Sequence, residues 1–368
     1  MFIFIIITIL YCLLSFLIGS RILKSVTKLK KFNKVAYWIV FTFISTSFLI
    51  YEIFKSTFPY ALNKILAFVS SYYLAFLVYI LLLFPIAFIL TKILKSRNKR
   101  LDFYIVSLVI TTLIVGIGTF FANSPYVKEY NITTEKPLKN GKLKVALVSD
   151  IHLGYSIGNS RLDRLKTELN KLDADVVLIA GDLVDGDLDP IIKDDMFSHL
   201  KGIKSTYGTY FATGNHDFYT GKVDELSNLL SEQGIHVLRN EATLINDDFY
   251  ILGRDDVTAD RMADKRPALE DITSNLNDSK FSILLDHNPQ NIKEAEGNNI
   301  DLQVSGHTHK GQIIPGNFVT HAIFPLDYGY GKFDNTNLVV SSGYGLWGPA
   351  IRIGSRSEIV LITISNDK

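Results

Sequence analysis

The sequence predicts a membrane protein in two parts, with four membrane-spanning helices in residues 1–122 followed by an α/β domain. Three observations support this fold class. Four long apolar runs without charged residues all lie before residue 123. Residues 1–122 carry a net charge of +11 and the rest of the chain carries −10, with all eight histidines in the second part. Beyond residue 122 the apolar runs become short and alternate with amphipathic segments, which is typical of strands and helices.

The four apolar runs cover residues 2–19, 35–51, 65–90 and 103–122. A helix crosses the bilayer core with about 20 apolar residues, and each run is close to or above that length. Helices of a soluble bundle would carry polar residues on an outer face, which these runs lack. A signal peptide would have basic residues ahead of its apolar stretch, whereas Arg21 and Lys24 follow the first run. We therefore expect four retained spanning helices in the cytoplasmic membrane.

Basic residues predict the orientation of these helices. Six Lys or Arg residues lie between the first and second runs and five between the third and fourth, but only Lys55 and Lys64 between the second and third. Because Lys and Arg concentrate in cytoplasmic loops, the two basic loops are expected inside. This places the N-terminus and everything after residue 122 outside the cytoplasm. The residues of the two basic loops are Arg21, Lys24, Lys28, Lys30, Lys31, Lys34, Lys92, Lys95, Arg97, Lys99 and Arg100.

Residues 144–368 are expected to form the globular domain. Residues 144–149 and 174–180 are typical of buried strands, and residues 160–172 between them form an amphipathic pattern, so the three segments predict a βαβ unit. Ser160 is the expected cap of that helix. Further strands are expected at residues 209–213, 236–238, 249–253, 281–285, 301–305, 338–341 and 359–364, and a further helix at residues 224–232.

Residues 123–143 connect the two parts, and two arrangements are open. Fully extended, residues 123–141 would span about 65 Å at about 3.4 Å per residue. If residues 126–132 instead join the sheet as a first strand, the domain is held close to the lipid headgroups.

Asp, His and Asn residues directly follow five of the expected strands. Ligands of open α/β sheets bind at the carboxyl ends of the strands. The sequence therefore predicts one polar site assembled from five strand ends. The five motifs are Ser149-Asp150-Ile151-His152, Gly181-Asp182-Leu183-Val184-Asp185, Gly214-Asn215-His216-Asp217, Asp286-His287-Asn288-Pro289 and Gly306-His307-Thr308-His309.

The side chains of these motifs are typical metal ligands. Imidazole, carboxylate and amide oxygen suit divalent ions such as Mn, Fe or Zn. Asp-x-His and His-x-His place two side chains on one face of an extended segment, and a carboxylate can bridge two ions. Two neighbouring ions form a clamp for in-line displacement at phosphorus. The only cysteine, Cys12, lies in the first apolar run, which excludes an internal disulfide and a cysteine-based zinc site.

The ordered set of motifs resembles the calcineurin-like metallophosphoesterase superfamily, from about residue 126 to the C-terminus. Residues 341–352 further resemble a bacterial membrane-associated or exported branch that is often labelled by similarity to UDP-2,3-diacylglucosamine pyrophosphatase. The resemblance implies a four-layer fold in which two central sheets lie between helices. It implies that the first metal ion binds Asp150, His152, Asp182 and His309, and that the second binds Asp182 as a bridge, Asn215, His287 and His307. It also implies that His216, oriented by Asp217, contacts the phosphate or protonates the leaving group.

Several residues in or near these motifs have open roles. Lys310 stands where related sequences usually have Gly, and it either contacts the phosphate of the substrate or points to solvent. Asp185 is expected to support a metal ligand or a turn rather than to bind metal. Arg352 and Arg356 either bind an anionic headgroup or form surface salt bridges.

The sequence as a whole predicts a membrane-anchored hydrolase of a phosphomonoester, phosphodiester or pyrophosphate, in which a hydroxide that bridges two metal ions attacks phosphorus. Mn²⁺ is the expected metal, with Fe or Zn as alternatives. The membrane anchor favours a lipid-linked substrate or an envelope precursor, and the acidic domain argues against nucleic acid. The alternative function is a catalytically silent, metal-binding membrane sensor or scaffold. Against that alternative, all seven ligand positions carry competent side chains.

Overall fold

The chain forms two compact units. The structure, a computed structural model, describes residues 2–29, 33–94, 102–262 and 265–366. The first unit, the helical unit, comprises Met1–Phe120 with Gly348–Ile351. The second, the α/β unit, comprises Phe121–Trp347 with Arg352–Lys368.

The helical unit contains four long α-helices, and a hydrogen bond of 2.8 Å from Tyr73 to Ser15 joins the third to the first. All four are long and apolar enough to cross a membrane. Many of their large apolar side chains are exposed, as side chains that face lipid would be. The helices are α1 (Phe2–Val26), α2 (Lys34–Phe54), α3 (Tyr60–Ile93) and α4 (Phe103–Asn123). Among the basic loop residues, Lys30, Lys31, Lys95, Arg97, Lys99 and Arg100 lie outside the described residues.

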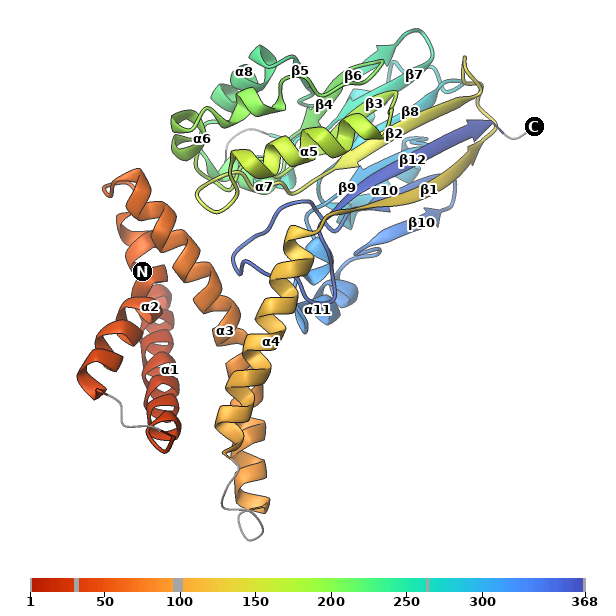
Figure 1. Cartoon of the computed structure of the whole chain (residues 1–368). Helices are drawn as coiled ribbons and strands as arrows, with labels where there is room; N and C mark the ends of the chain where they lie inside the picture. Colours follow the sequence, from red (N-terminus) through yellow and green to blue (C-terminus); the bar gives the residue numbers. More distant parts are fainter. Residues whose placement is uncertain (1, 30–32, 95–101, 263–264, 367–368) are drawn as a thin grey trace. The chain divides into compact units, whose positions relative to one another are not determined.

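Two mixed six-stranded sheets form the centre of the α/β unit (Figure 1). The first has the order β1 (Tyr126–Thr134), β12 (Glu358–Asn366), β2 (Lys142–Val148), β3 (Val176–Ala180), β4 (Thr209–Ala212), β5 (Ile235–Val237). The second has the order β10 (Gly329–Phe333), β11 (Thr336–Val340), β9 (Leu302–Ser305), β8 (Phe281–Leu285), β7 (Phe249–Gly253), β6 (Glu241–Ile245). Strands β2, β3 and β4 run parallel in the first sheet, and β8 and β9 run parallel in the second.

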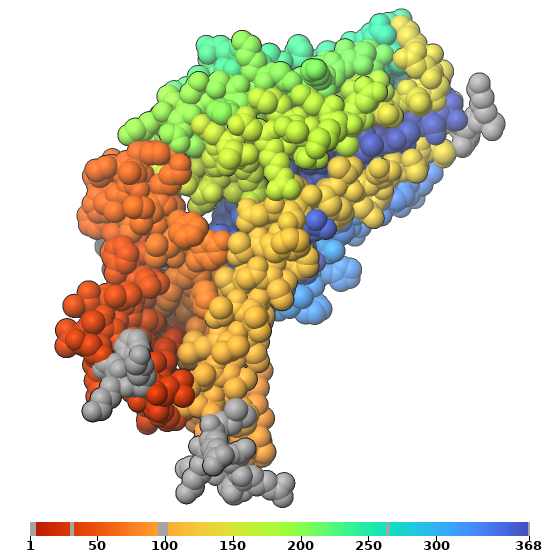
Figure 2. Space-filling model, viewed as in Figure 1, coloured from red at the N-terminus to blue at the C-terminus, as the bar shows by residue number. Residues whose placement is uncertain are grey.

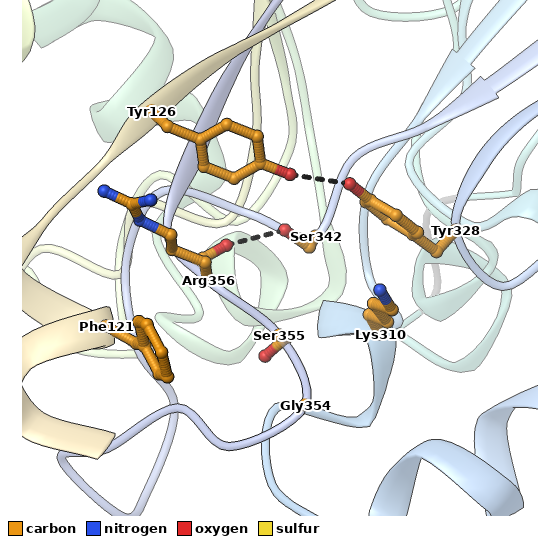
Figure 3. Close-up of a pocket in the computed structure, with 8 residues that line it drawn as sticks. All are labelled: Phe121, Tyr126, Lys310, Tyr328, Ser342, Gly354, Ser355 and Arg356. Atoms are coloured by element: carbon orange, nitrogen blue, oxygen red, sulfur yellow. Dashed lines mark hydrogen bonds between the residues drawn. The ribbon is translucent and has the colours of Figure 1, made fainter. Parts of the chain in front are cut away.

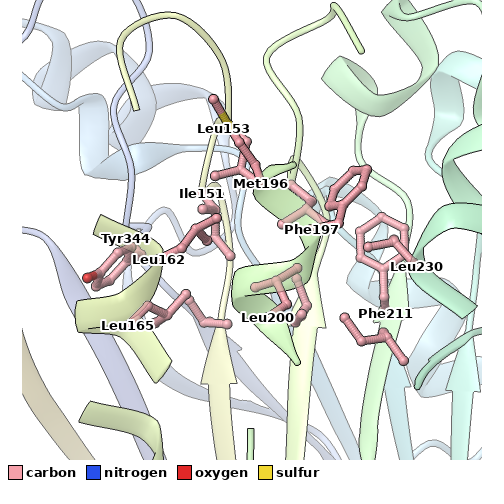
Figure 4. Close-up of a cluster of buried hydrophobic side chains, with 14 of the residues drawn as sticks. Ile151, Leu153, Leu162, Leu165, Met196, Phe197, Leu200, Phe211, Leu230 and Tyr344 are labelled. Carbon is pink, nitrogen blue, oxygen red and sulfur yellow. The ribbon is translucent and has the colours of Figure 1, made fainter. Parts of the chain in front are cut away.

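Three apolar layers hold these sheets and their helices together. Alternate side chains of β2, β3 and β4 pack against α5 (Asn159–Lys171), α6 (Asp189–Lys193) and α8 (Val223–Glu232), and this layer includes Leu162, Leu165 and Phe211 (Figure 4). The other faces of these strands pack against the second sheet. The outer face of the second sheet is covered by α9 (Leu269–Thr273) and α10 (Ile292–Gly297). The predicted four-layer α/β fold is thus confirmed.

The last residues of α4 are tied into the α/β unit. The carbonyl oxygen of Ala122 accepts hydrogen bonds from Arg161 Nη2 at 2.7 Å and from Ser357 Oγ at 2.8 Å. Only Ser124 and Pro125 separate α4 from β1, and β1 pairs in parallel with β12 along its whole length. Of the two arrangements considered for the connector, the structure has the strand. In Figure 2, part of β12 remains visible between α5 and β1.

The sequence analysis did not predict β6, β10 and α11, whose pattern of apolar residues is weak. Strands β6 and β10 are edge strands with mostly exposed or half-buried residues, so they lack the apolar signal of the central strands. The helix α11 (Gly316–Ile323) has no buried residue. The expected cap at Ser160 is wrong, because α5 begins one residue earlier, after Gly158, and has no side-chain cap.

Candidate metal centre

Five strand ends bring all seven predicted ligands to one edge of the two sheets. Strands β2, β3 and β4 end just before Asp150, Asp182 and Asn215, and β8 and β9 end just before His287 and His307. His152 lies two residues after Asp150, and His309 lies two residues after His307. All seven side chains are buried except that of His307, which is half-buried. The predicted convergence is therefore present, and the binding of metal by these residues stays a prediction.

The first group of ligand atoms comes from Asp150, His152 and His309. The Nε2 atoms of His152 and His309 lie 3.0 Å apart, and His309 Nε2 lies 3.3 Å from Oδ1 of Asp150. Two nitrogen ligands that each lie about 2.1 Å from one ion, at right angles, are about 3.0 Å apart. This spacing is what two imidazoles on one ion would show.

The second group comes from Asp182, His287 and His307, with Asn215 beside it. Nε2 of His287 lies 3.2 Å from Oδ2 of Asp182, and Nδ1 of His307 lies 2.8 Å from Oδ1 of Asn215. The same Oδ2 of Asp182 lies 3.8 Å from Nε2 of His152, which belongs to the first group. The carboxylate of Asp182 therefore stands between the two groups, where a bridging ligand would stand.

Hydrogen bonds to the protein fix which atom each ligand presents. His287 donates its Nδ1 proton to the carbonyl oxygen of Ala180 at 2.7 Å, and its buried Nε2 has no hydrogen-bond partner. This hydrogen bond fixes the orientation of the ring so that Nε2 faces Oδ2 of Asp182 at 3.2 Å, as hydrogen bonds to the other ring nitrogen do for metal-binding histidines. Oδ1 of Asp150 accepts the backbone N–H of His307 at 2.9 Å, and Oδ2 accepts the hydroxyl of Ser149. No pattern in the sequence indicates this role of Ser149.

Most of the ligand residues adopt a left-handed backbone conformation. Positive φ is uncommon for residues other than Gly, and it is costly unless the surroundings impose it. Here neighbouring segments hold the turns, since Asp150 N donates to Gly181 O and His152 N donates to Asp182 O, each at 3.0 Å. The side chains are thus directed into the site by the fold itself. The residues and their φ values are Asp150 (51°), His152 (52°), Asp182 (51°), His307 (70°) and His309 (49°).

Two glycines have no side chain where two of the candidate ligands lie. A Cβ atom at Gly214 would lie 2.2 Å from Oδ1 of Asp182. A Cβ atom at Gly181, whose φ is +79°, would lie 2.4 Å from Nδ1 of His287. The absence of a side chain at both positions is therefore a condition for the placement of Asp182 and His287.

The charges of the site favour the metal-binding forms of Asp182 and His309, whereas they raise the pKa values of His152 and His287. Burial raises the pKa of the Asp182 carboxyl, but His287 and His152 outweigh it and hold that pKa well below its usual range. Burial, His152 and Arg352 together hold the pKa of His309 well below its usual range. An ionised carboxylate and a neutral imidazole are the forms that bind metal. Burial opposes protonation of His287, but Asp182 raises its pKa well above the usual value, so metal binding there would release a proton.

Asp217 has a different contact from the one that the sequence predicts. Its Oδ2 accepts the backbone N–H groups of Asp182 at 2.9 Å and Gly214 at 2.8 Å, and its Oδ1 accepts that of Val184 at 3.0 Å. Burial and the carboxylate of Asp182 raise the pKa of Asp217 to about 7, while the Gly214 and Val184 amides lower it. The expected role of Asp217 in orienting His216 is wrong, because both of its oxygens bind the backbone and tie the two turns together.

Asp185 contacts His216 in place of Asp217. Oδ1 of Asp185 lies 3.1 Å from Nδ1 of His216 and 3.4 Å from Nδ1 of His152. Asp185 thus orients a candidate ligand and the candidate proton donor together, in keeping with the supporting role expected for it. His216 also lies within reach of His152 and Asp182 as a third group of possible ligand atoms, a position that the sequence did not predict.

Both readings of Arg352 as a surface residue are wrong, because its side chain is fully buried. Its Nη2 donates to the carbonyl oxygens of Gly343 at 3.1 Å and Gly345 at 2.8 Å, and it lies 3.4 Å from Nδ1 of His309. Arg352 therefore packs behind a candidate ligand. The sequence cannot show this, since an Arg after a Gly-rich stretch is most often exposed.

The ammonium group of Lys310 lies 4.2 Å from the centre of the Tyr328 ring, at the wall of a cavity (Figure 3).

Comparison with known proteins agrees with this geometry. The sequence profile of the calcineurin-like phosphoesterases matches residues 143–311, a range that contains all seven candidate ligands. An uncharacterized metallophosphoesterase of Campylobacter jejuni is 31% identical, and the alignment covers 99% of this chain and 98% of that protein. The chain belongs to the calcineurin-like metallophosphoesterase family.

Two further relatives of this metallophosphoesterase are similar over much of its length. An uncharacterized metallophosphoesterase of Helicobacter pylori is 30% identical over 94% of this chain and 93% of its own length. A transmembrane protein with a metallophosphoesterase domain from Danio rerio is 35% identical over 71% of this chain, and the chain spans 62% of that relative. The names of these three relatives state only the metallophosphoesterase family and, for one of them, a transmembrane protein. They identify neither a substrate nor a branch of the family.

The residues present in this metallophosphoesterase fit two divalent ions. The donor set of imidazole nitrogens, carboxylate oxygens and one amide oxygen suits Mn, Fe and Zn alike. His287 Nε2 is a buried polar atom that makes no hydrogen bond and lies 3.2 Å from Oδ2 of Asp182, as expected for two atoms that bind one ion. Because the donor set suits several metals, the choice of Mn²⁺ stays a prediction.

The close approach of Gly214 to Asp182 gives a test of the metal centre. In Gly214→Ala, the new methyl group would displace Asp182 from its position. The backbone of Gly214 has a φ of −110°, which Ala adopts without strain, but the methyl group would also lie 2.4 Å from the backbone nitrogen of Asp182, so the shift includes the backbone of Asp182. We expect the purified variant to keep its circular dichroism spectrum but to lose one or both metal ions per chain by elemental mass spectrometry.

The matched control is Gly158→Ala, because Gly158 also has negative φ (−121°) and no atom lies within 4 Å of a Cβ placed there. It should bind as much metal as the wild type. Equal metal content in the two variants would contradict the placement of Asp182 between the ions.

Proposed function

We propose that this metallophosphoesterase hydrolyses a phosphate ester or pyrophosphate with the help of two divalent ions. The ions would be held by Asp150, His152, Asp182 and His309 at the first position and by Asp182, Asn215, His287 and His307 at the second. The observation that carries the proposal is that one carboxylate oxygen, Asp182 Oδ2, lies between two separate groups of buried ligand atoms. Bound there, the two ions would activate water for attack on phosphorus and neutralise the charge of the phosphate oxygens.

The other polar residues of the site would position the substrate and transfer a proton. His216 is half-buried at the rim of the group, and Asp185 engages its Nδ1 at 3.1 Å. The second ring nitrogen, Nε2, is then available to donate a proton to the departing oxygen, which is general acid catalysis. Asp217 supports this arrangement indirectly, because it holds the turns that carry Asp182 and His216.

The anchor supports a substrate in or near the membrane. Four helices of membrane-spanning length precede the domain, and α4 runs almost directly into β1. A lipid-linked phosphate or an envelope precursor meets this condition, and so does a pyrophosphate of a membrane-associated nucleotide-sugar. The net charge of −10 after residue 122 disfavours nucleic acid as the substrate.

The proposed reaction is tested by Asp182→Ala in the full chain. The variant should lose almost all hydrolysis of bis-p-nitrophenyl phosphate with Mn²⁺, because it removes the ligand between the two groups. Asp278→Ala, at an exposed position on the same unit, should keep wild-type activity. If Asp182→Ala turns over substrate at the wild-type rate, the two-metal proposal fails. A wild-type protein that binds metal but hydrolyses none of a panel of phosphoesters would support the sensor or scaffold instead.

The role of His216 is tested with leaving groups of different basicity. His216→Gln should lower kcat by about 10²–10⁴-fold on a substrate with an alkoxide leaving group, which needs a proton to depart. The loss should be much smaller for p-nitrophenolate, which departs without one. Equal losses on both substrates would assign His216 to the binding of metal or phosphate rather than to proton donation.

The proposed location of the domain outside the cytoplasm is tested by labelling in intact bacterial cells. Cys12 is the only cysteine, so Cys12→Ser provides a background without thiols. In that background, Lys293→Cys on the α/β unit should react with a membrane-impermeant maleimide, whereas Leu29→Cys in the first basic loop should react only after lysis. Both positions are exposed. The reverse pattern would overturn the orientation.

A further inference from the structure

The α/β unit contains a second candidate binding site, a cavity of about 300 Å³. It differs from the metal centre because none of the seven candidate ligands lines it. Arg352 lies between the two sites, since its Nη2 is 3.4 Å from His309 Nδ1 and its Nη1 donates to Ser355 Oγ at 3.3 Å. The residues that line the cavity are Phe121, Tyr126, Lys310, Tyr328, Ser342, Gly354, Ser355 and Arg356 (Figure 3).

The cavity carries two positive charges that no carboxylate balances directly. The ammonium group of Lys310 rests over the Tyr328 ring, and the guanidinium of Arg356 lies 5.2 Å from the centre of the Tyr126 ring. Arg356 uses its Nε to donate to the carbonyl oxygen of Ser124. Neither Lys310 nor Arg356 forms an ion pair with any residue in the described part of the chain. Figure 3 shows the two cations on opposite sides of the cavity, with Ser342 and Ser355 between them.

The buried carboxylate of Glu358, next to the cavity, accepts hydrogen bonds from groups other than Lys310 and Arg356. Glu358 is fully buried, and its Oε2 accepts the hydroxyl groups of Tyr126 and Tyr328, each at 3.0 Å. Its Oε1 accepts the backbone N–H of Ser342 at 2.7 Å. Glu358 therefore holds the two tyrosines in place as walls of the cavity and leaves Lys310 and Arg356 free to bind an anion from outside.

Exposed apolar side chains lie beside the cavity. Phe121 belongs to the last turn of α4, and it lines the cavity opposite Lys310 (Figure 3). Another lining residue, Gly354, contacts Ile314, which would lie 2.8 Å from a Cβ at that position. Ile314 leads into α11, where Phe318 is 67% exposed and Val319 and Ile323 are each 56% exposed. An exposed apolar helix beside a basic cavity is the composition of a surface that binds the interface of a bilayer.

We propose that this cavity binds the phosphate group of an anionic membrane lipid, with the apolar side chains of α11 against the adjoining acyl region. Lys310 and Arg356 bind the phosphate oxygens, and charge-assisted bonds of this kind are stronger than neutral ones. The occupied cavity fixes the α/β unit at the headgroup layer of the membrane in which its own helices are anchored. The site is separate from the proposed hydrolysis, because it uses none of the candidate metal ligands.

The proposal is tested by calorimetric titration of the full chain in detergent, stripped of metal so that phosphate cannot bind at the metal centre. The probes are dihexanoyl phosphatidylglycerol, its zwitterionic counterpart dihexanoyl phosphatidylcholine, and inorganic phosphate. Wild-type protein should bind the phosphatidylglycerol most tightly. Lys310→Gln and Arg356→Gln should each weaken that binding by about tenfold or more. Lys293→Gln, at an exposed lysine that does not line the cavity, should bind as the wild type does.

Each outcome decides the proposal. Inorganic phosphate that binds as tightly as the anionic lipid would show a site for free phosphate and overturn the lipid assignment. Equal binding of both lipids, or unchanged binding in both variants, would overturn the site. If Arg356→Gln loses its circular dichroism spectrum because Arg356 also holds Ser124, Lys310→Gln decides alone, since Lys310 makes no side-chain hydrogen bond among the described residues.

Discussion

The position of the Asp182 carboxylate is the constraint on which the rest of the site depends. One of its oxygens lies near imidazoles of both ligand groups, and the other accepts the backbone N–H of His216 at 2.7 Å. Its own N–H is held by Asp217, and the space beside it exists because residue 214 has no side chain. A carboxylate in such a buried position is stable only when positive charge surrounds it. The surrounding histidines provide part of that charge, and two bound ions would provide the rest.

The fold explains why such a costly arrangement can exist at all. Two sheets pack face to face, and parallel strands from both deliver their carboxyl ends to one edge. Each strand is buried where it ends, and backbone hydrogen bonds between neighbouring segments hold the turns in which the ligand residues have positive φ. Three residues contact the candidate ligands from behind. Ser149 contacts Asp150, Asp185 contacts His152, and Arg352 contacts His309. Contacts within the protein therefore position the candidate ligands, which would reduce the reorganisation that metal binding requires.

The sequence predicts this molecule well where a local pattern reports directly on structure. Apolar runs of membrane length predict α1 to α4, and short buried runs predict the central strands and the polar strand ends that follow them. It fails where the outcome depends on three-dimensional surroundings. Nothing near Asp217 indicates that the backbone amides of Asp182 and Val184, from a different turn, will meet its carboxylate together with that of Gly214. Arg352 appears in sequence as an ordinary surface cation, and only the packing of the chain shows that it is enclosed. Edge strands such as β10, in which Gly329 and Gly331 take alternate positions and Lys332 follows, carry too little apolar signal to be recognised.

The number of metal ions and their separation test the central claim most directly. Electron paramagnetic resonance of the full chain loaded with Mn²⁺, together with elemental analysis, measures both. A shared carboxylate between two ligand groups predicts two Mn²⁺ per chain and a spectrum of two magnetically coupled ions. A single ion per chain, or two ions whose spectra are those of isolated Mn²⁺, would contradict the account of Asp182 as the residue that joins the two metal positions.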